Sequence, residues 1–212
     1  MPQKIKHYSA REEKFSAYSH LAGVLLAIAG GSQFIRLAAE KNDTLFTGGL
    51  IFYWVSLILM FGASGFYHLC RSEKLKVHAR KLDHCAIYLL ITGTYAPLIF
   101  LYLQNAAGYT VFALLLAATV AGIGGKIVFK QRFHKIEVAL YLLMGWCCVA
   151  IAKPMLTLIP HFSLWLLLAG GIAYSGGVIL YAMRREFAHA AWHIAVLAGV
   201  VLHYMCIIYA AN

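Results

Sequence analysis

Residues 188–210 read AHAAWHIAVLAGVVLHYMCIIYA, a stretch that contains no Asp, Glu, Lys or Arg. An α-helix needs about 20 mostly apolar residues to cross the hydrocarbon core of a bilayer, so this stretch is long enough to span one. The rest of the chain has the same character, because 62% of its residues are hydrophobic and only 12% are charged. A soluble domain carries about a quarter charged residues. The chain is therefore expected to be an integral membrane protein.

Six further apolar runs precede this stretch, and short polar joints separate them. The seven predicted spans are Phe15–Leu37, Thr44–Cys70, Leu82–Leu103, Tyr109–Phe129, Ile136–Ala152, Ser163–Tyr181 and Ala188–Ala210. The fifth is the shortest, and Pro154 and Pro160 are predicted to mark the joint that follows it. The sequence thus predicts an all-α, seven-transmembrane helix bundle that forms a single domain over residues 1–212.

Lys and Arg are distributed unevenly between the two ends of the predicted bundle. Fifteen of the 18 lie on one side: Lys4, Lys6, Arg11, Lys14, Arg71, Lys74, Lys76, Arg80, Lys81, Lys126, Lys130, Arg132, Lys135, Arg184 and Arg185. Arg36, Lys41 and Lys153 lie on the other. Cytoplasmic loops are enriched in Lys and Arg, so we expect a cytoplasmic N-terminus and an extracytoplasmic C-terminus in the cell (inner or plasma) membrane. The same clusters explain the net charge of +10, which favours membrane lipids as partners over nucleic acid.

Several ionisable side chains fall within the predicted spans, where they are costly and commonly mark a functional site. In the predicted orientation, six of them lie near the cytoplasmic ends of four spans: His20, His68, Asp83, His84, His189 and His193. Glu137 lies beside a basic joint and is expected to be a solvated interfacial charge. His203 is about 15 Å beyond His193 along a helix, so it is expected to be structural.

Three of these histidines form a candidate metal site. His189 and His193 are four residues apart, so they share one helix face and can bind one ion together. His68 lies at the same predicted depth, with Ser64 one helical turn away. Three neutral imidazoles with an open fourth position are typical of a catalytic zinc site. Asp83 is placed to accept a hydrogen bond near such an ion or to hold a metal-bound water.

A second interpretation requires no metal. A histidine inside a span is commonly a hydrogen-bonded packing residue, and His-x-x-x-His by itself is a weak motif. For His20 and His84 we expect either hydrogen bonds to neighbouring helices or positions at the headgroup level. Glu13 is ambiguous.

Taken together, these residues resemble the motifs of the bacterial haemolysin III-type members of the progestin and adipoQ receptor (PAQR) superfamily. The matching stretches are Glu13 with Ser19-His20, SGFYH at 64–68, KLDH at 81–84, ITGTYAP at 91–97, and HAAWH at 189–193 with His203. The resemblance implies a seven-helix bundle with zinc held by His68, His189 and His193, Asp83 bound through a water, and Ser64 nearby.

The same superfamily is similar to alkaline ceramidases, which implies a metal-dependent lipid amide hydrolase. Two features depart from the family pattern. Ser16 stands where the first motif usually has Asn, and Ala191 and Trp192 lie between the two histidines of the last motif. Neither change removes a ligand, but both affect the shape of a substrate pocket.

Two functions of different classes follow. In the first, the chain is an intramembrane zinc hydrolase of a lipid-like amide or ester, with Asp83 accepting the proton of the attacking water and Ser64 donating to the developing oxyanion. In the second, it is a non-enzymatic homeostasis sensor or cytolytic protein, in which zinc joins the spans structurally. A constitutive pore would need a polar stripe through the outer halves of the spans, which offer little beyond His203. The sequence names neither a substrate nor an oligomeric state.

Overall fold

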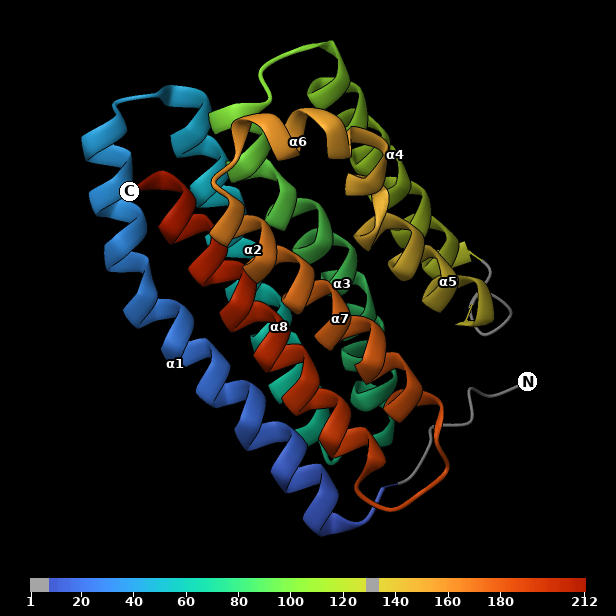
Figure 1. The fold of residues 1–212 in the computed structure, drawn as a ribbon. Coiled ribbons are helices and arrows are strands. Elements are labelled where there is room, and N and C mark those ends of the chain that lie inside the picture. The colour runs from blue at the N-terminus through green and yellow to red at the C-terminus, as the bar shows by residue number, and fades with distance from the viewer. Residues whose placement is uncertain (1–7, 129–133) are drawn as a thin grey trace.

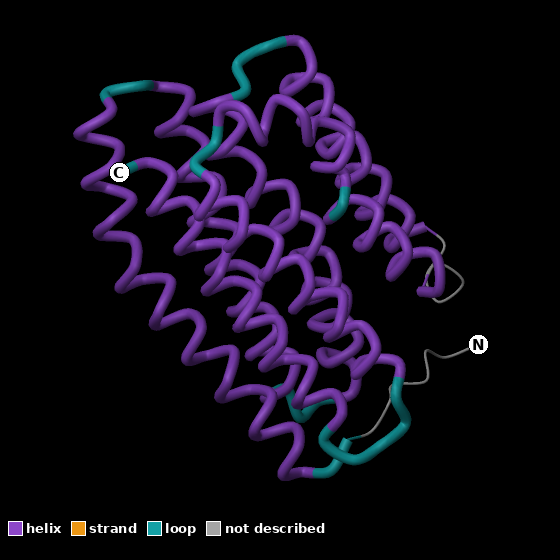
Figure 2. Tube along the Cα trace, in the orientation of Figure 1, coloured by secondary structure: helices purple, strands orange, loops and turns teal. Residues whose placement is uncertain are grey.

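The computed structural model describes residues 8–128 and 134–212, and within these residues it consists of helices joined by short loops, with no strand (Figures 1 and 2). The elements are α1 (Ala10–Lys41), α2 (Thr44–Leu69), α3 (Glu73–Tyr102), α4 (Ala106–Val128), α5 (His134–Gly145), the 3-10 helix η2 (Cys147–Ile151), α6 (Ala152–Leu158), α7 (His161–Ala182) and α8 (Ala188–Ala211). Among the described residues, seven helical segments are long and apolar enough to cross a membrane. The predicted seven-helix fold of a multi-pass membrane protein is confirmed.

Two helices begin earlier than their apolar runs predict. The first begins at Ala10 instead of Phe15, and the third at Glu73 instead of Leu82. The additional turns are polar, so hydropathy alone misses them. At α1 the Ser9 side chain accepts a hydrogen bond from the Glu12 amide at 3.2 Å, a standard N-cap. The predicted end of the fourth span, Phe129, lies outside the described residues.

The fifth crossing is interrupted and longer than predicted. It extends over Ile136–Leu158 instead of ending at Ala152, and it consists of α5, η2 and α6 in succession. The predicted role of Pro154 as part of a joint is therefore wrong. Pro154 lies in the first turn of α6. Backbone N–H groups in the first turn make no hydrogen bond within the helix, so proline, which lacks an N–H, is tolerated there. Pro160 does mark a joint, because it directly precedes α7.

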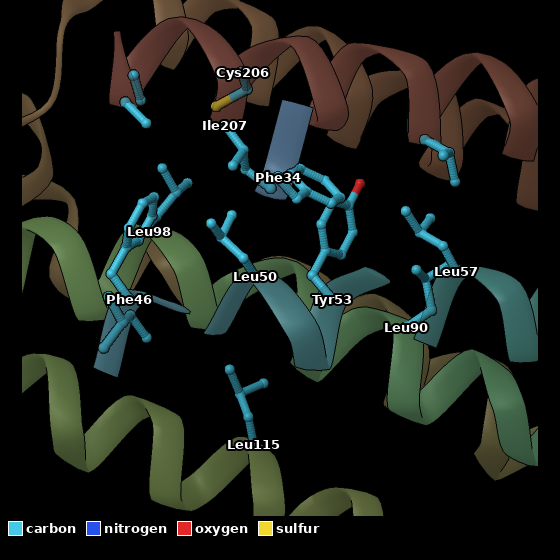
Figure 3. Close-up of a cluster of buried hydrophobic side chains, with 14 of the residues drawn as sticks. Phe34, Phe46, Leu50, Tyr53, Leu57, Leu90, Leu98, Leu115, Cys206 and Ile207 are labelled. Carbon is cyan, nitrogen blue, oxygen red and sulfur yellow. The ribbon is translucent and has the colours of Figure 1, made fainter. Parts of the chain in front are cut away.

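The helices pack so that α2 lies against α1 and α3, while α8 lies against α7 and α1 (Figure 1). Buried side chains of α1, α2 and α8 meet between them, and Figure 3 shows Phe34, Tyr53 and Ile207 in this core. The rings of Phe34 and Tyr53 lie 5.8 Å apart. The outward surface carries large apolar side chains such as Leu25, Leu143 and Val120, the last 72% exposed. Lipid is the solvent that such a surface requires.

One end of the bundle, here called the basic end, is where α1, α3, α5 and α8 begin and α2, α4 and α7 end. Arg71, Lys126 and Arg184 lie at or next to this end. All but one of the buried charged or imidazole side chains of the described residues gather in the same half of the molecule, the exception being His203: Glu12, His20, His68, His84, Lys126, Glu137, His189 and His193, together with the hydroxyls of Ser16 and Ser64. Which side of the membrane the basic end faces remains a prediction from the charge distribution.

Candidate metal centre and its cavity

The last turns of α2 supply one histidine of the candidate site. His68 is followed by the helix end at Leu69, and Ser64 lies one turn deeper on the same face. Both are buried, with 5% and 2% of their surfaces exposed. The helix positions His68 at the basic end and directs its ring toward the first turns of α8.

The start of α8 supplies the other two histidines. Phe187 has a φ of 60°, and this left-handed residue turns the chain from the α7–α8 loop into the helix. His189 follows two residues after Phe187, and His193 lies one helical turn further along α8 on the same face. The Nε2 atoms of His189 and His68 lie 3.3 Å apart, and those of His193 and His189 lie 3.1 Å apart.

These distances fit a bound metal ion. One ligand atom from each of His68, His189 and His193 lies within 4.8 Å of the others. Nitrogen ligands at 2.0–2.1 Å from a tetrahedral zinc ion are about 3.3–3.4 Å apart, close to the separations observed. Imidazole also binds copper, iron and nickel. The three histidines could therefore hold a metal ion, and its identity as zinc belongs to the proposal below.

Glu13 orients His68 from the outside. Its Oε2 lies 2.7 Å from Nδ1 of His68, and its Oε1 accepts a hydrogen bond from Nζ of Lys76 at 2.6 Å. A carboxylate at Nδ1 holds the proton on that nitrogen, which leaves Nε2 unprotonated and able to bind a metal. The sequence left Glu13 without a role, because nothing in α1 indicates that its side chain reaches the end of α2.

Asp83 and Ser64 line the same cavity as His189 and His193. The cavity is lined at its polar end by Ser64, Asp83, His189 and His193, and the Ser64 hydroxyl interacts with the Asp83 carboxylate. Asp83 is not among the residues whose ligand atoms cluster within 4.8 Å. It therefore lies beside the three histidines without belonging to the set, which suits a role through water.

His20 lies beside the three histidines and is enclosed by neighbouring rings. It is 3% exposed, and its ring packs on His193 with centroids 3.8 Å apart and on the ring of Phe61 at 5.1 Å. His20 is also part of the cavity lining. The expected hydrogen bonds to neighbouring helices are not found, because neither ring nitrogen of His20 has a hydrogen-bond partner among the described residues. Its depth relative to the lipid headgroups stays a prediction.

The prediction for Glu137 is also wrong. Its side chain is fully buried, and its Oε2 lies 2.7 Å from Nζ of Lys126 and 3.0 Å from Nδ1 of His84. The hydroxyl of Tyr141 donates to the carbonyl of His84 at 2.7 Å. A carboxylate next to a basic joint can still be buried when a lysine and an imidazole share it. The expectation that His84 hydrogen-bonds neighbouring helices is confirmed.

His203 lies apart from the three-histidine cluster, as expected. Its Nε2 lies 3.0 Å from the carbonyl oxygen of Leu167 on α7, and it is not part of the three-histidine cluster. Its ring nevertheless lines the far part of the cavity, and also a second cavity that shares Thr94, Tyr95 and Trp146 with the first. A largely apolar space therefore extends from the metal site toward the other end of the bundle.

Three tyrosines and an arginine at the basic end of the cavity were not identified from the sequence. Tyr8, Tyr67, Arg80 and Tyr181 all line it. Tyr8 precedes α1, and its ring stacks on His189 with centroids 4.3 Å apart and planes inclined by 17°. Tyrosine and arginine near span ends are usually interfacial anchors, so their types alone gave no sign of this arrangement.

Comparison with known proteins finds one matching family model and similar bacterial proteins. A family model described as "Haemolysin-III related" matches residues 8–204. The chain is 34% identical over 200 residues to "Hemolysin-3" of Bacillus cereus, which covers 94% of this chain and 91% of that protein. It is 32% identical over 203 residues to "Hemolysin-3 homolog" of Bacillus subtilis (strain 168), which covers 95% of each.

A more distant similarity extends to a eukaryotic protein. The "Heptahelical transmembrane protein ADIPOR2" of Oryza sativa subsp. japonica is 25% identical over 184 residues, which cover 73% of this chain and 80% of that protein. No solved structure matches the chain significantly.

Proposed function

Because the chain belongs to the haemolysin-III-related family of the PAQR superfamily, and because its three buried imidazoles converge at an apolar cavity, we propose that it is an intramembrane zinc-dependent hydrolase of lipid amides or esters. The observation that carries this proposal is the convergence of His68, His189 and His193 on one point with Asp83 beside them. Three protein ligands leave a coordination position for water or substrate, which is the arrangement of catalytic zinc sites.

The residues would divide the chemistry as follows. A zinc ion, when bound, polarises a carbonyl oxygen and makes water a nucleophile at neutral pH. Asp83 accepts the proton of the attacking water and delivers it to the leaving nitrogen or oxygen. Ser64 lies beside Asp83 at the polar end of the cavity, so we assign Ser64 first to orienting that carboxylate, and its donation to the oxyanion requires the hydroxyl to turn toward the substrate.

The walls of the cavity support a lipid substrate. Beyond the polar end the lining is mostly apolar, with Met60, Ile87, Leu90, Ile91 and Val196 among its residues. Such side chains bind hydrocarbon and exclude water, which strengthens the electrostatic interactions at the site. The second cavity lengthens this space, and an extended acyl chain fits its composition.

The experiment that tests the function has two parts. Lipid extracts are profiled before and after incubation with the purified protein, with and without a chelator, to find a lipid that is consumed only when metal is present. The Asp83→Asn variant is then assayed on that lipid. We expect its turnover to fall by roughly a hundred- to ten-thousandfold, as on loss of a general base, while metal content and melting temperature are preserved.

Asp43→Asn is the matched control, since Asp43 caps α2 at the opposite end through the Phe46 amide, at 2.9 Å, and Asn caps equally well. If the metal is a structural staple, Asp83→Asn instead lowers metal retention and melting temperature. No metal-dependent loss of any lipid, or full turnover in Asp83→Asn, would contradict the hydrolase.

A further inference from the structure

One cation in the cavity wall is not used by the proposed chemistry. Arg80 lies three residues before Asp83 on α3, which is one turn nearer the basic end, and it lines the cavity. No carboxylate of the described residues lies within the 4.0 Å salt-bridge distance of its guanidinium. A guanidinium presents a planar fork of N–H donors that fits phosphate or carboxylate oxygens.

The neighbouring cation is already neutralised. Lys76 binds Glu13 through Nζ and Oε1 at 2.6 Å, and the same ammonium lies 5.2 Å above the Tyr67 ring. With a divalent ion on the three histidines, the charges of that ion and Arg80 exceed those of the two carboxylates near the recess, Asp83 and the buried Glu12. The basic end of the cavity therefore carries a positive excess that attracts an anion.

Three tyrosines complete a recess around this charge. Tyr181 lines the cavity together with Arg80, and its ring lies 6.0 Å from His189. Tyr8 covers His189, and Tyr67 packs against His68 with centroids 4.6 Å apart. A tyrosine hydroxyl is protonated at neutral pH, so the hydroxyls of these side chains can donate hydrogen bonds.

We propose that Arg80, Tyr8, Tyr67 and Tyr181, here called the Arg80 recess, bind the anionic oxygen group of a lipid substrate, a phosphate or a carboxylate. The recess opens onto the mostly apolar cavity, so one molecule can place its anion at Arg80, its polar linkage at the three histidines and its hydrocarbon among the apolar side chains. The recess depends on the proposed function, and it restricts the substrate to anionic lipids in preference to neutral ones.

A binding measurement tests the recess without requiring turnover. Dodecyl phosphate, dodecanoate and dodecanol are titrated into the full-length protein in neutral detergent, with the metal content determined for every variant. We expect both anions to bind at least about tenfold more tightly than the alcohol, because a charge-assisted hydrogen bond contributes that much. Arg80→Gln should abolish this preference, and Lys81→Gln, which removes the adjacent positive charge, should preserve it.

Two further measurements identify the source of the anion and provide a test that remains valid if one variant does not fold. Inorganic phosphate is added at the concentration at which dodecyl phosphate saturates the protein, and we expect it not to bind. If inorganic phosphate displaces bound dodecyl phosphate at that concentration, the assignment of the recess to a lipid is overturned. Arg80→Lys retains the charge without the fork and should lose part of the preference, so it provides a test if Arg80→Gln does not fold. Equal binding of anions and alcohol to the wild type would overturn the recess.

The same data separate the recess from the hydrolase. Preference for anions by a protein that consumes no lipid would contradict the proposed function and support the recess. Metal-dependent consumption of lipids by a protein that shows no preference for anions would support the proposed function and contradict the recess.

Discussion

At the scale of single residues, the pairing of Glu13 with His68 fixes the tautomer of a buried imidazole, which is what the proposed metal site requires. The carboxylate lies at Nδ1, and Lys76 fixes its other oxygen. Both contacts join residues that are far apart in sequence. A histidine without such a partner would distribute its proton between the two ring nitrogens, and part of the population would present an N–H to the ion.

The contribution of this pair can be measured directly. Glu13→Gln preserves the size of the side chain but loses its charge, so we expect metal affinity to fall by about ten- to a hundredfold, the usual effect of losing a carboxylate that orients a histidine ligand. Affinity is measured by competition with a chelator of known strength. Glu73→Gln serves as control, because Glu73 is exposed at the same end of the bundle. Equal losses in both variants would show that general charge, and not the contact, matters.

At the scale of elements, the cluster of Lys126, His84 and Glu137 connects three helices. It joins α4, α3 and α5, with contacts of 2.7 Å, 2.9 Å and 3.0 Å among the three charged or titratable groups. The helix α5 contacts α7 only slightly, so this buried cluster is a main attachment of α5 to the rest of the bundle. His84 is also the neighbour of Asp83 and lines the cavity.

Removing one partner of the cluster should destabilise the protein strongly. In Glu137→Leu the ammonium of Lys126 remains buried without its carboxylate, and in Lys126→Met the carboxylate remains with less compensation. We expect each to lower the free energy of unfolding by about 3–5 kcal/mol. The double variant should be more stable than either single one, as measured by thermal unfolding in detergent. A double variant whose losses simply add would show that the two groups do not interact.

The element scale also shows what hydropathy can predict. All seven crossings follow from the apolar runs, but the polar first turns of α1 and α3 do not, because caps such as Ser9 extend a helix without adding hydrophobicity. The division of the fifth crossing at Cys147–Ile151 has no clear signal in its composition. Glu137 was misplaced because burial of a charge depends on partners from other helices, and a single sequence does not show which side chains meet.

At the scale of the whole molecule, the candidate site was predictable because topology brings its parts together. Alternating spans place the end of α2 and the starts of α3 and α8 at one end, so His68, Asp83, His189 and His193 had to lie at a similar depth. The depth of a residue in the membrane does not specify the direction in which its side chain points around the helix bundle. The sequence therefore could not show that Glu13 reaches His68, nor that Tyr8 and Arg80 face the cavity.

The orientation of the bundle in the membrane follows from the charge distribution and is open to test. A reporter that is active only in the cytoplasm should work when fused after Lys135 and be silent when fused after Asn212, because the first point is at the basic end and the second at the opposite end. Activity at both points would contradict an odd number of crossings. Activity after Asn212 alone would reverse the orientation.

Metal content is the most direct test of the three-histidine site at the centre of the proposed function. The purified wild-type protein, analysed by elemental mass spectrometry, should contain about one zinc ion per chain. The His189→Ala, His193→Ala double variant should lose nearly all of it. His203→Ala should retain it, since that ring contacts the Leu167 carbonyl and is not part of the cluster. Wild-type zinc content in the folded double variant would contradict the site.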